Sequence, residues 1–194
     1  MAGKRKHSIR YLITVFLGTF SIAAILGSSS EAVLRFFPAA VTWLLLLIVI
    51  LIGILFDIIG IAVTAADEAP HHARAAKKVF GAKQSVFLIK RADKVANFAN
   101  DIVGDITGTI SGAMGATIII RVVTKHPELS NWQVLLNILI LALIASFTVT
   151  GKAWGKTIAI NEANRIVAFT GRIIAGVEDF TRINFTKTSK RGGK

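Results

Sequence analysis

The chain has no cysteine among its 194 residues. This absence excludes disulfide bonds, thiolate metal sites and thiol catalysis. The sequence also lacks a phosphate-binding glycine loop and the Gly-x-Ser-x-Gly pattern of a nucleophilic serine. Its serine and threonine residues have no evident base partner in the sequence. We therefore do not expect an enzyme.

Charged residues are nearly absent from several long stretches, which are filled by aliphatic residues instead. Hydrophobic residues make up 53% of the chain, and the stretch 41–66 contains a single ionisable group, Asp57. About 20 apolar residues in a helix span the hydrocarbon core of a bilayer. The sequence thus predicts an all-α integral membrane protein with four transmembrane helices, at about 11–28, 41–66, 102–123 and 134–151. The first could instead be a signal peptide, because it follows a basic start and precedes small residues.

Acidic residues are also few, 11 against 23 Lys and Arg, which gives a net charge of +12. With the N-terminus inside, 20 of the 23 basic residues fall on one side of the predicted membrane. The positive-inside rule then places both termini in the cytoplasm. We expect a multi-pass protein of the plasma membrane, whose basic segments meet anionic lipid and not nucleic acid.

Two long segments on the predicted inner side carry apolar residues at helical spacing. They predict basic amphipathic helices at 70–100 and 154–185, lying at the inner membrane surface or packed under the transmembrane bundle. Their role could be anchoring alone. Gly81 is expected to interrupt the first helix. Residues 186–194 predict a solvated basic tail, and the whole chain is expected to form one membrane domain. The apolar stripe of the second helix is Ile160, Ala163, Val167, Thr170, Ile174, Val177 and Phe180.

Asp57 is the first candidate for function, because a carboxylate inside a membrane helix is costly. Helical spacing puts it on one face of its span with the small or polar residues Gly53, Gly60 and Thr64. The alternative is that Asp57 has a structural partner, either Asn137 or a lysine that reaches up from the cytoplasmic side. The third span carries a second stripe, made of Asn97, Asp101, Gly104, Asp105, Gly108, Gly112 and Gly115.

We expect these two stripes to face each other and to bring their acids to one cavity in the inner half of the membrane. The predicted ligands are Asp57, Asp101 and Asp105, joined by Glu68 at the inner end. Such a cavity offers only oxygen ligands, which suit a hard divalent cation and Mg²⁺ above all. A proton or Na⁺ relay through Asp57 is the open alternative. Asp101 and Asp105 could instead complement a helix dipole.

The glycines of the third span predict a close helix contact. Gly104, Gly108 and Gly112 are spaced by four residues and form a ridge on which another helix backbone can approach. Plain helix packing is a sufficient explanation for this ridge. An additional function is not required by its spacing.

From about residue 41 to 177, the order of features resembles the transmembrane domain of the CorC/CNNM magnesium transporter family. The matching stretches are TAADEA at 64–69, VGDITGT at 103–109 and GKAWGKTIA at 151–159. The resemblance implies that Glu68 takes the place of the family's helix-end glutamate. It also implies that Gly104 and Asp105 take the places of a Gly-Asn pair in the family's motif. Thr109 takes the place of a later asparagine of that motif and would be a neutral ligand. A homodimer is also implied.

The sequence departs from the family pattern at several motif positions. Asp67 stands in place of the serine next to the family's helix-end glutamate. Lys152 and Gly155 stand in place of a glutamate and a proline in the motif with which the family's last membrane helix ends. Because only a short tail follows Phe185, we expect no cytoplasmic CBS-domain pair, and 11–28 predicts an additional N-terminal membrane helix. These substitutions give the motif positions more carboxylate and fewer amide side chains, which would alter ion selectivity or abolish transport.

Two functions therefore stay open. The first is a transporter or exporter of divalent cations such as Mg²⁺. The second is a non-transporting membrane partner or scaffold subunit that binds another membrane protein or anionic lipid. A pairing of Asp57 with a lysine or arginine would count against the first.

Overall fold

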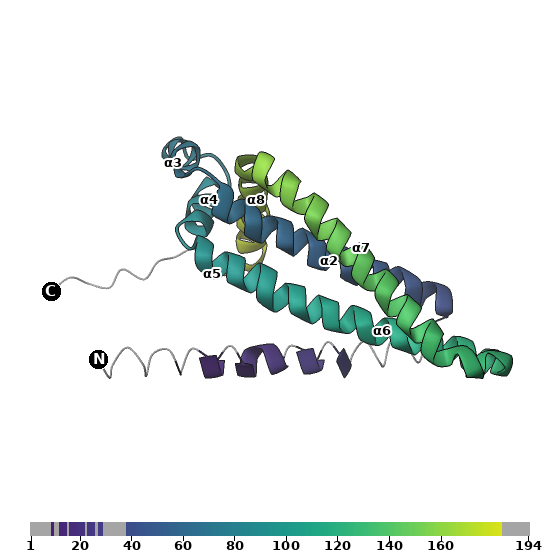
Figure 1. Cartoon of the computed structure of the whole chain (residues 1–194). Helices are drawn as coiled ribbons and strands as arrows, with labels where there is room; N and C mark the ends of the chain where they lie inside the picture. Colours follow the sequence, from purple (N-terminus) through teal and green to yellow (C-terminus); the bar gives the residue numbers. More distant parts are fainter. Residues whose placement is uncertain are drawn as a thin grey trace. The chain divides into compact units, whose positions relative to one another are not determined.

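The structure is a computed structural model that describes residues 9, 12–14, 16–21, 23–25, 27, 28 and 38–183. Throughout this part of the chain the regular structure is helical (Figure 1), which confirms the all-α prediction. The helices are α2 (Ala39–Ala65), α3 (Glu68–Ala76), α4 (Ala82–Ile89), α5 (Ala92–Ala96), the π-helix η1 (Asn97–Val103), α6 (Gly104–Lys125), the 3₁₀ helix η2 (Pro127–Trp132), α7 (Gln133–Asn161) and α8 (Ala163–Thr181).

Three helical stretches are long and apolar enough to cross a membrane: Ala40–Ala65, Ala92–Lys125 and Pro127–Asn161. They coincide with three of the four predicted spans, except for the last residue of the span 41–66, so the multi-pass prediction is confirmed at this level. The helices extend beyond the predicted limits because backbone hydrogen bonding continues past the apolar core into polar ends. In the first predicted span, 11–28, the structure describes a shorter apolar helix, Leu12–Ile25. Several residues of that span, and the whole predicted tail 186–194, lie outside the described residues.

The chain divides into two compact units. The first unit comprises Met1–Ile54 and Ile102–Gly151. Its core is a cluster of aliphatic side chains from α2, α6 and α7, including Ile50, Met114 and Ile144, and Ala23 packs against the same cluster. A Cβ added at Gly115 would lie 2.5 Å from the Ile144 side chain, so this glycine allows α6 and α7 to approach closely.

The second unit comprises Leu55–Asp101 and Lys152–Lys194. Helices α3, α4 and α8 contact one another in this unit, and Val63, Leu88, Ala159 and Val167 belong to its buried core. The predicted amphipathic segments therefore pack together as a helical layer. The segment 70–100 forms three helices and the start of a π-helix. Gly81 does interrupt it, with a left-handed backbone (φ 79°) immediately before α4.

The segment 154–185 is also divided, because α7 continues to Asn161 and the backbone leaves the helix at Glu162. Of the apolar stripe expected on this segment, Ala163, Val167 and Thr170 are buried. Val177 and Phe180 are exposed instead. The side of α8 that packs on α4 is thus made mainly of small residues, and Ile160, Val177 and Phe180 of the predicted stripe lie outside this contact.

Candidate functional site

The intramembrane carboxylate of Asp57 has a basic partner in the second unit. Asp57 Oδ1 lies 3.7 Å from Nζ of Lys152 on α7, and the two side chains are 14% and 30% exposed. This arrangement is the structural alternative anticipated for Asp57, with a lysine and not Asn137 as the partner. Charged residues inside a membrane are normally paired with one another, and Lys152 is such a partner for Asp57.

One turn further along α2, Gly60 faces Asn100. A Cβ added at Gly60 would collide with the side-chain amide of Asn100, so a larger residue there would require this amide to move. Asn100 Oδ1 is buried and has no hydrogen-bond partner among the described residues. Asn100 lies within the π-helix η1, and single π-helical turns inside α-helices are frequent at functional sites. A buried acceptor without a donor is therefore found on the same unit as the Asp57–Lys152 pair.

The third span does not present the stripe that the sequence predicted. In the second unit, Asn100 of the third span lies against Gly60 of α2. In the first unit, Thr107 of the third span lies against Gly53 of α2, where an added Cβ would collide with it. Asp101, Asp105 and Gly108 are exposed. Asn100 and Thr107 are seven residues apart and lie on one helical face, which is offset from the face of the predicted stripe.

The other predicted ligands have local partners. Asp101 accepts a hydrogen bond of 2.5 Å from Asn97, and Glu68 lies 3.7 Å from His72 on the surface of α3. The Thr109 hydroxyl donates to the main-chain carbonyl of Asp105. Within the described ranges, no group of three or more His, Asp or Glu side chains is close enough to hold a metal ion. The five-residue Mg²⁺ site thus stays a prediction.

The predicted glycine ridge is only partly enclosed. Gly104 is buried, a Cβ at Gly112 would lie 3.9 Å from Leu141, and one at Gly108 would have no described neighbour within 4 Å. Within one chain the close approaches occur at other glycines. Gly53 and Gly60 belong to the stripe read from α2, and Gly115 to the stripe on the third span.

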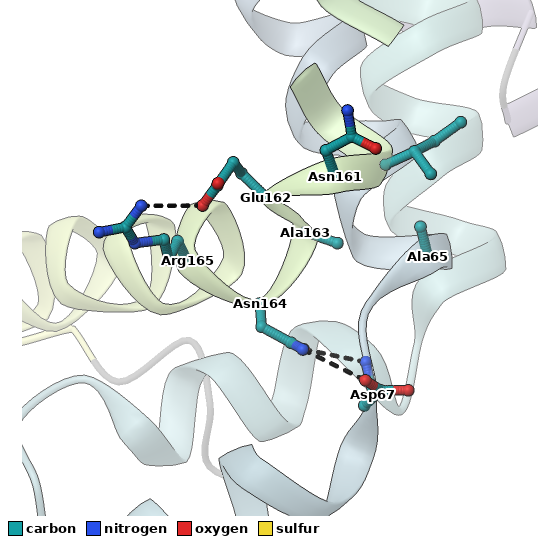
Figure 2. Close-up of a pocket in the computed structure, with 8 residues that line it drawn as sticks. Ala65, Asp67, Asn161, Glu162, Ala163, Asn164 and Arg165 are labelled. Atoms are coloured by element: carbon teal, nitrogen blue, oxygen red, sulfur yellow. Dashed lines mark hydrogen bonds and ion pairs between the residues drawn. The ribbon is translucent and has the colours of Figure 1, made fainter. Parts of the chain in front are cut away.

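A polar pocket of about 240 Å³ lies in the second unit, where α2 ends and α7 turns into α8. Asn164 bridges the two segments: its Oδ1 accepts the main-chain N–H of Asp67 at 3.0 Å, and its Nδ2 donates to the Asp67 carboxylate at 3.2 Å (Figure 2). Arg165 pairs with Glu162 at 3.0 Å and points away from Asp67. Spacing along the sequence gave no signal for this junction, because Asp67 and Asn164 are 97 residues apart.

His71 on α3 is the largest fully buried side chain. Burial lowers the pKa of His71, and a hydrogen bond with Asn164 opposes this effect only in part. Nearby charges also contribute to the pKa, with Arg74 lowering it and Asp67 raising it. The Nε2 atom has no hydrogen-bond partner within the described part of the chain. His71 is therefore held neutral inside the α3–α4–α8 layer.

Comparisons with protein-family models, with curated proteins and with solved structures found no match to this chain. The resemblance to the CorC/CNNM family stays a prediction from sequence motifs.

Proposed function

We propose that this protein moves a hard cation across the membrane, with Asp57 as the carboxylate that binds the ion. Lys152 is the built-in counter-charge that neutralises Asp57 when no cation is bound. The observation that carries the proposal is the carboxylate of Asp57 within a candidate membrane span, because ionisable residues there usually mark ion pathways. Its pairing with Lys152 counts against transport by the criterion given above, so the proposal requires that the cation displace the ammonium. This proposal replaces a permanent four-carboxylate site with a site at which the cation and Lys152 compete.

The electrostatics of the pair support such a competition. Two opposite charges about 4 Å apart attract each other by roughly 4 kcal/mol at an effective dielectric constant of 20. Asp57 therefore loses a large interaction when Lys152 leaves, and a cation can recover it by taking the same place. The contact of 3.7 Å is longer than a charge-assisted hydrogen bond, and Lys152 is partly exposed. The ammonium is thus not fixed to the carboxylate by a short hydrogen bond.

The nature of the ion follows from the available ligands. The Asp57 carboxylate and the unpartnered Oδ1 of Asn100 are both oxygen atoms, which favour hard cations. Mg²⁺ keeps several waters and needs few protein ligands. The resemblance to the CorC/CNNM family adds the expectation of Mg²⁺ and of a homodimer. The distribution of basic residues supports both termini in the cytoplasm and a plasma-membrane location.

A set of four variants tests this proposal in liposomes. The set comprises Asp57→Asn, Lys152→Met, their combination, and Lys156→Met as a control one turn along α7. We expect Mg²⁺ flux in the wild type and in the control, and no flux after Asp57→Asn. Lys152→Met should lower the Mg²⁺ concentration that gives half-maximal thermal stabilisation, because it removes the competing charge. Equal Mg²⁺ stabilisation in wild type and Asp57→Asn would contradict the proposal.

The second candidate is a non-transporting membrane subunit that binds another membrane protein. It is favoured by the open Gly108 position on α6, at which a partner helix would find no side chain in its way. If the pair of Asp57 and Lys152 is only structural, each single variant should destabilise the protein, the double variant should restore stability, and no variant should show flux. Disulfide formation between Gly108→Cys copies in membranes would identify a homodimer.

A further inference from the structure

Helix α8 exposes its largest apolar side chains. Phe169, Ile173, Val177 and Phe180 are 63%, 51%, 45% and 91% exposed. They are spaced by four, four and three residues, so they form one continuous stripe along the helix. Contiguous exposed apolar surface of this kind marks an interaction site.

The opposite side of α8 explains why this stripe is left outside. Val167, Ala168, Gly171 and Ala175 are buried, and a Cβ at Gly171 would lie 2.5 Å from the carbonyl oxygen of Gly81. The helix is therefore attached to α4 through its small residues, at close backbone distance. The fold of the second unit does not use the bulky stripe.

Helix α8 directly follows a candidate membrane span in the chain. The candidate span Pro127–Asn161 ends two residues before α8 begins at Ala163. Only Glu162 separates the two helices, and its backbone (φ −113°, ψ 24°) departs from helical geometry. Helix α8 is thus a separate helix whose start is held at the end of a transmembrane helix.

The charges beside the stripe favour an anionic surface. Helical spacing places Arg165 and Arg172 along one edge of the stripe, and both are exposed. Arg165 is paired with Glu162, and Asp179 lies further along the same edge. Arg172 is therefore the residue that can meet an anionic headgroup while the neighbouring apolar stripe enters the acyl boundary.

We infer that α8 is an interfacial membrane helix, with Phe169, Ile173, Val177 and Phe180 inserted at the boundary of headgroups and acyl chains. Arg172 contacts the phosphate of anionic phospholipid. The inference concerns the surface of the second unit and does not depend on the proposed cation transport. It commits the stripe to lipid and not to a second protein.

Site-directed spin labelling of the full-length protein in liposomes tests this inference, and the absence of native cysteine makes each introduced cysteine unique. Ile173→Cys and Val177→Cys place labels on the stripe. Lys83→Cys on the exposed side of α4 is the control. We expect the stripe labels to be accessible to oxygen and shielded from a water-soluble nickel complex. The control label should show the reverse.

Lipid composition then tests the charge. Adding phosphatidylglycerol to phosphatidylcholine should increase the immersion depth of the stripe labels, and Arg172→Gln should reduce this increase. A depth that is independent of phosphatidylglycerol would overturn the anionic contact. Nickel accessibility equal to that of the control would overturn membrane insertion. Exclusion of both oxygen and nickel, with a short distance between labels on two copies, would assign the stripe to a protein interface instead.

Discussion

The close approach of α4 and α8 can be tested with one methyl group. In Gly171→Ala, the new Cβ would collide with the Ser85 hydroxyl and lie 2.5 Å from the Gly81 carbonyl oxygen and 2.9 Å from the Ser85 main-chain nitrogen. Two of these three neighbours are backbone atoms, which cannot rotate away as a flexible side chain can. Helix α8 must therefore move away from α4 to admit the methyl group.

The size of the effect follows from three contributions. Overpacking of a tight contact costs about 1–3 kcal/mol. The Ser85 hydroxyl, which donates its hydrogen bond toward the carbonyls of Gly81 and Val167, is displaced at a cost of about 1 kcal/mol. Alanine recovers about 1 kcal/mol over glycine through helix propensity. We expect Gly171→Ala to lower the free energy of unfolding by about 1–3 kcal/mol.

Gly176 on the same helix supplies a matched control. No described atom lies within 4 Å of a Cβ added there, so Gly176→Ala keeps the gain in helix propensity without the collision. It should stabilise the protein by about 0.5–1 kcal/mol. For a chain of this length, each kcal/mol changes Tm by about 2–4 °C. The two alanine variants should therefore shift Tm in opposite directions.

Far-UV circular dichroism during heating in detergent measures both shifts, and hydrogen exchange locates them. The exchange of α4 and α8 amides should accelerate in Gly171→Ala and not in Gly176→Ala. If both variants stabilise the protein equally, the reasoning about backbone contact between α4 and α8 is refuted. The same conclusion would follow if faster exchange appeared only in α6 and α7.

Two further predictions concern pH and topology. Because burial depresses the pKa of His71 below its usual 6.5, the unfolded chain binds a proton more readily than the folded one. The stability contributed by neutral His71 is complete above pH 6.5 and is lost as the pH falls toward the lower pKa of the folded state. His71→Gln should therefore weaken the dependence of Tm on pH. His72→Gln, on the exposed side of α3, should leave this dependence unchanged. For topology, a cysteine at His126 should react with an impermeant reagent in intact cells, whereas a cysteine at Lys83 should react only after permeabilisation. Labelling of Lys83→Cys in intact cells would reverse the proposed orientation.

The amino-acid sequence by itself determined which segments are long and apolar enough to cross a membrane. Apolar length is a local property, because a bilayer requires each spanning helix to satisfy its backbone internally over a fixed thickness. Three of the predicted spans are accordingly present in the structure. The break at Gly81 was also readable, since glycine readily adopts the positive φ found there. From the sequence, the structural partner of Asp57 could be either Asn137 or a lysine on the cytoplasmic side, and spacing alone did not decide between them.

Tertiary structure decided how the helical faces are directed. Asn100 and Thr107 pack against Gly60 and Gly53 of α2, whereas Asp101, Asp105 and Gly108 are exposed. Helical spacing put these two sets on different faces of the third span, but it could not tell which face meets α2. On α8, small residues are buried and large apolar ones are exposed, because the backbone contact between Gly81 and Gly171 admits no larger side chain. Periodicity identifies a face of a helix, whereas the shape of the neighbouring helix determines which face is buried.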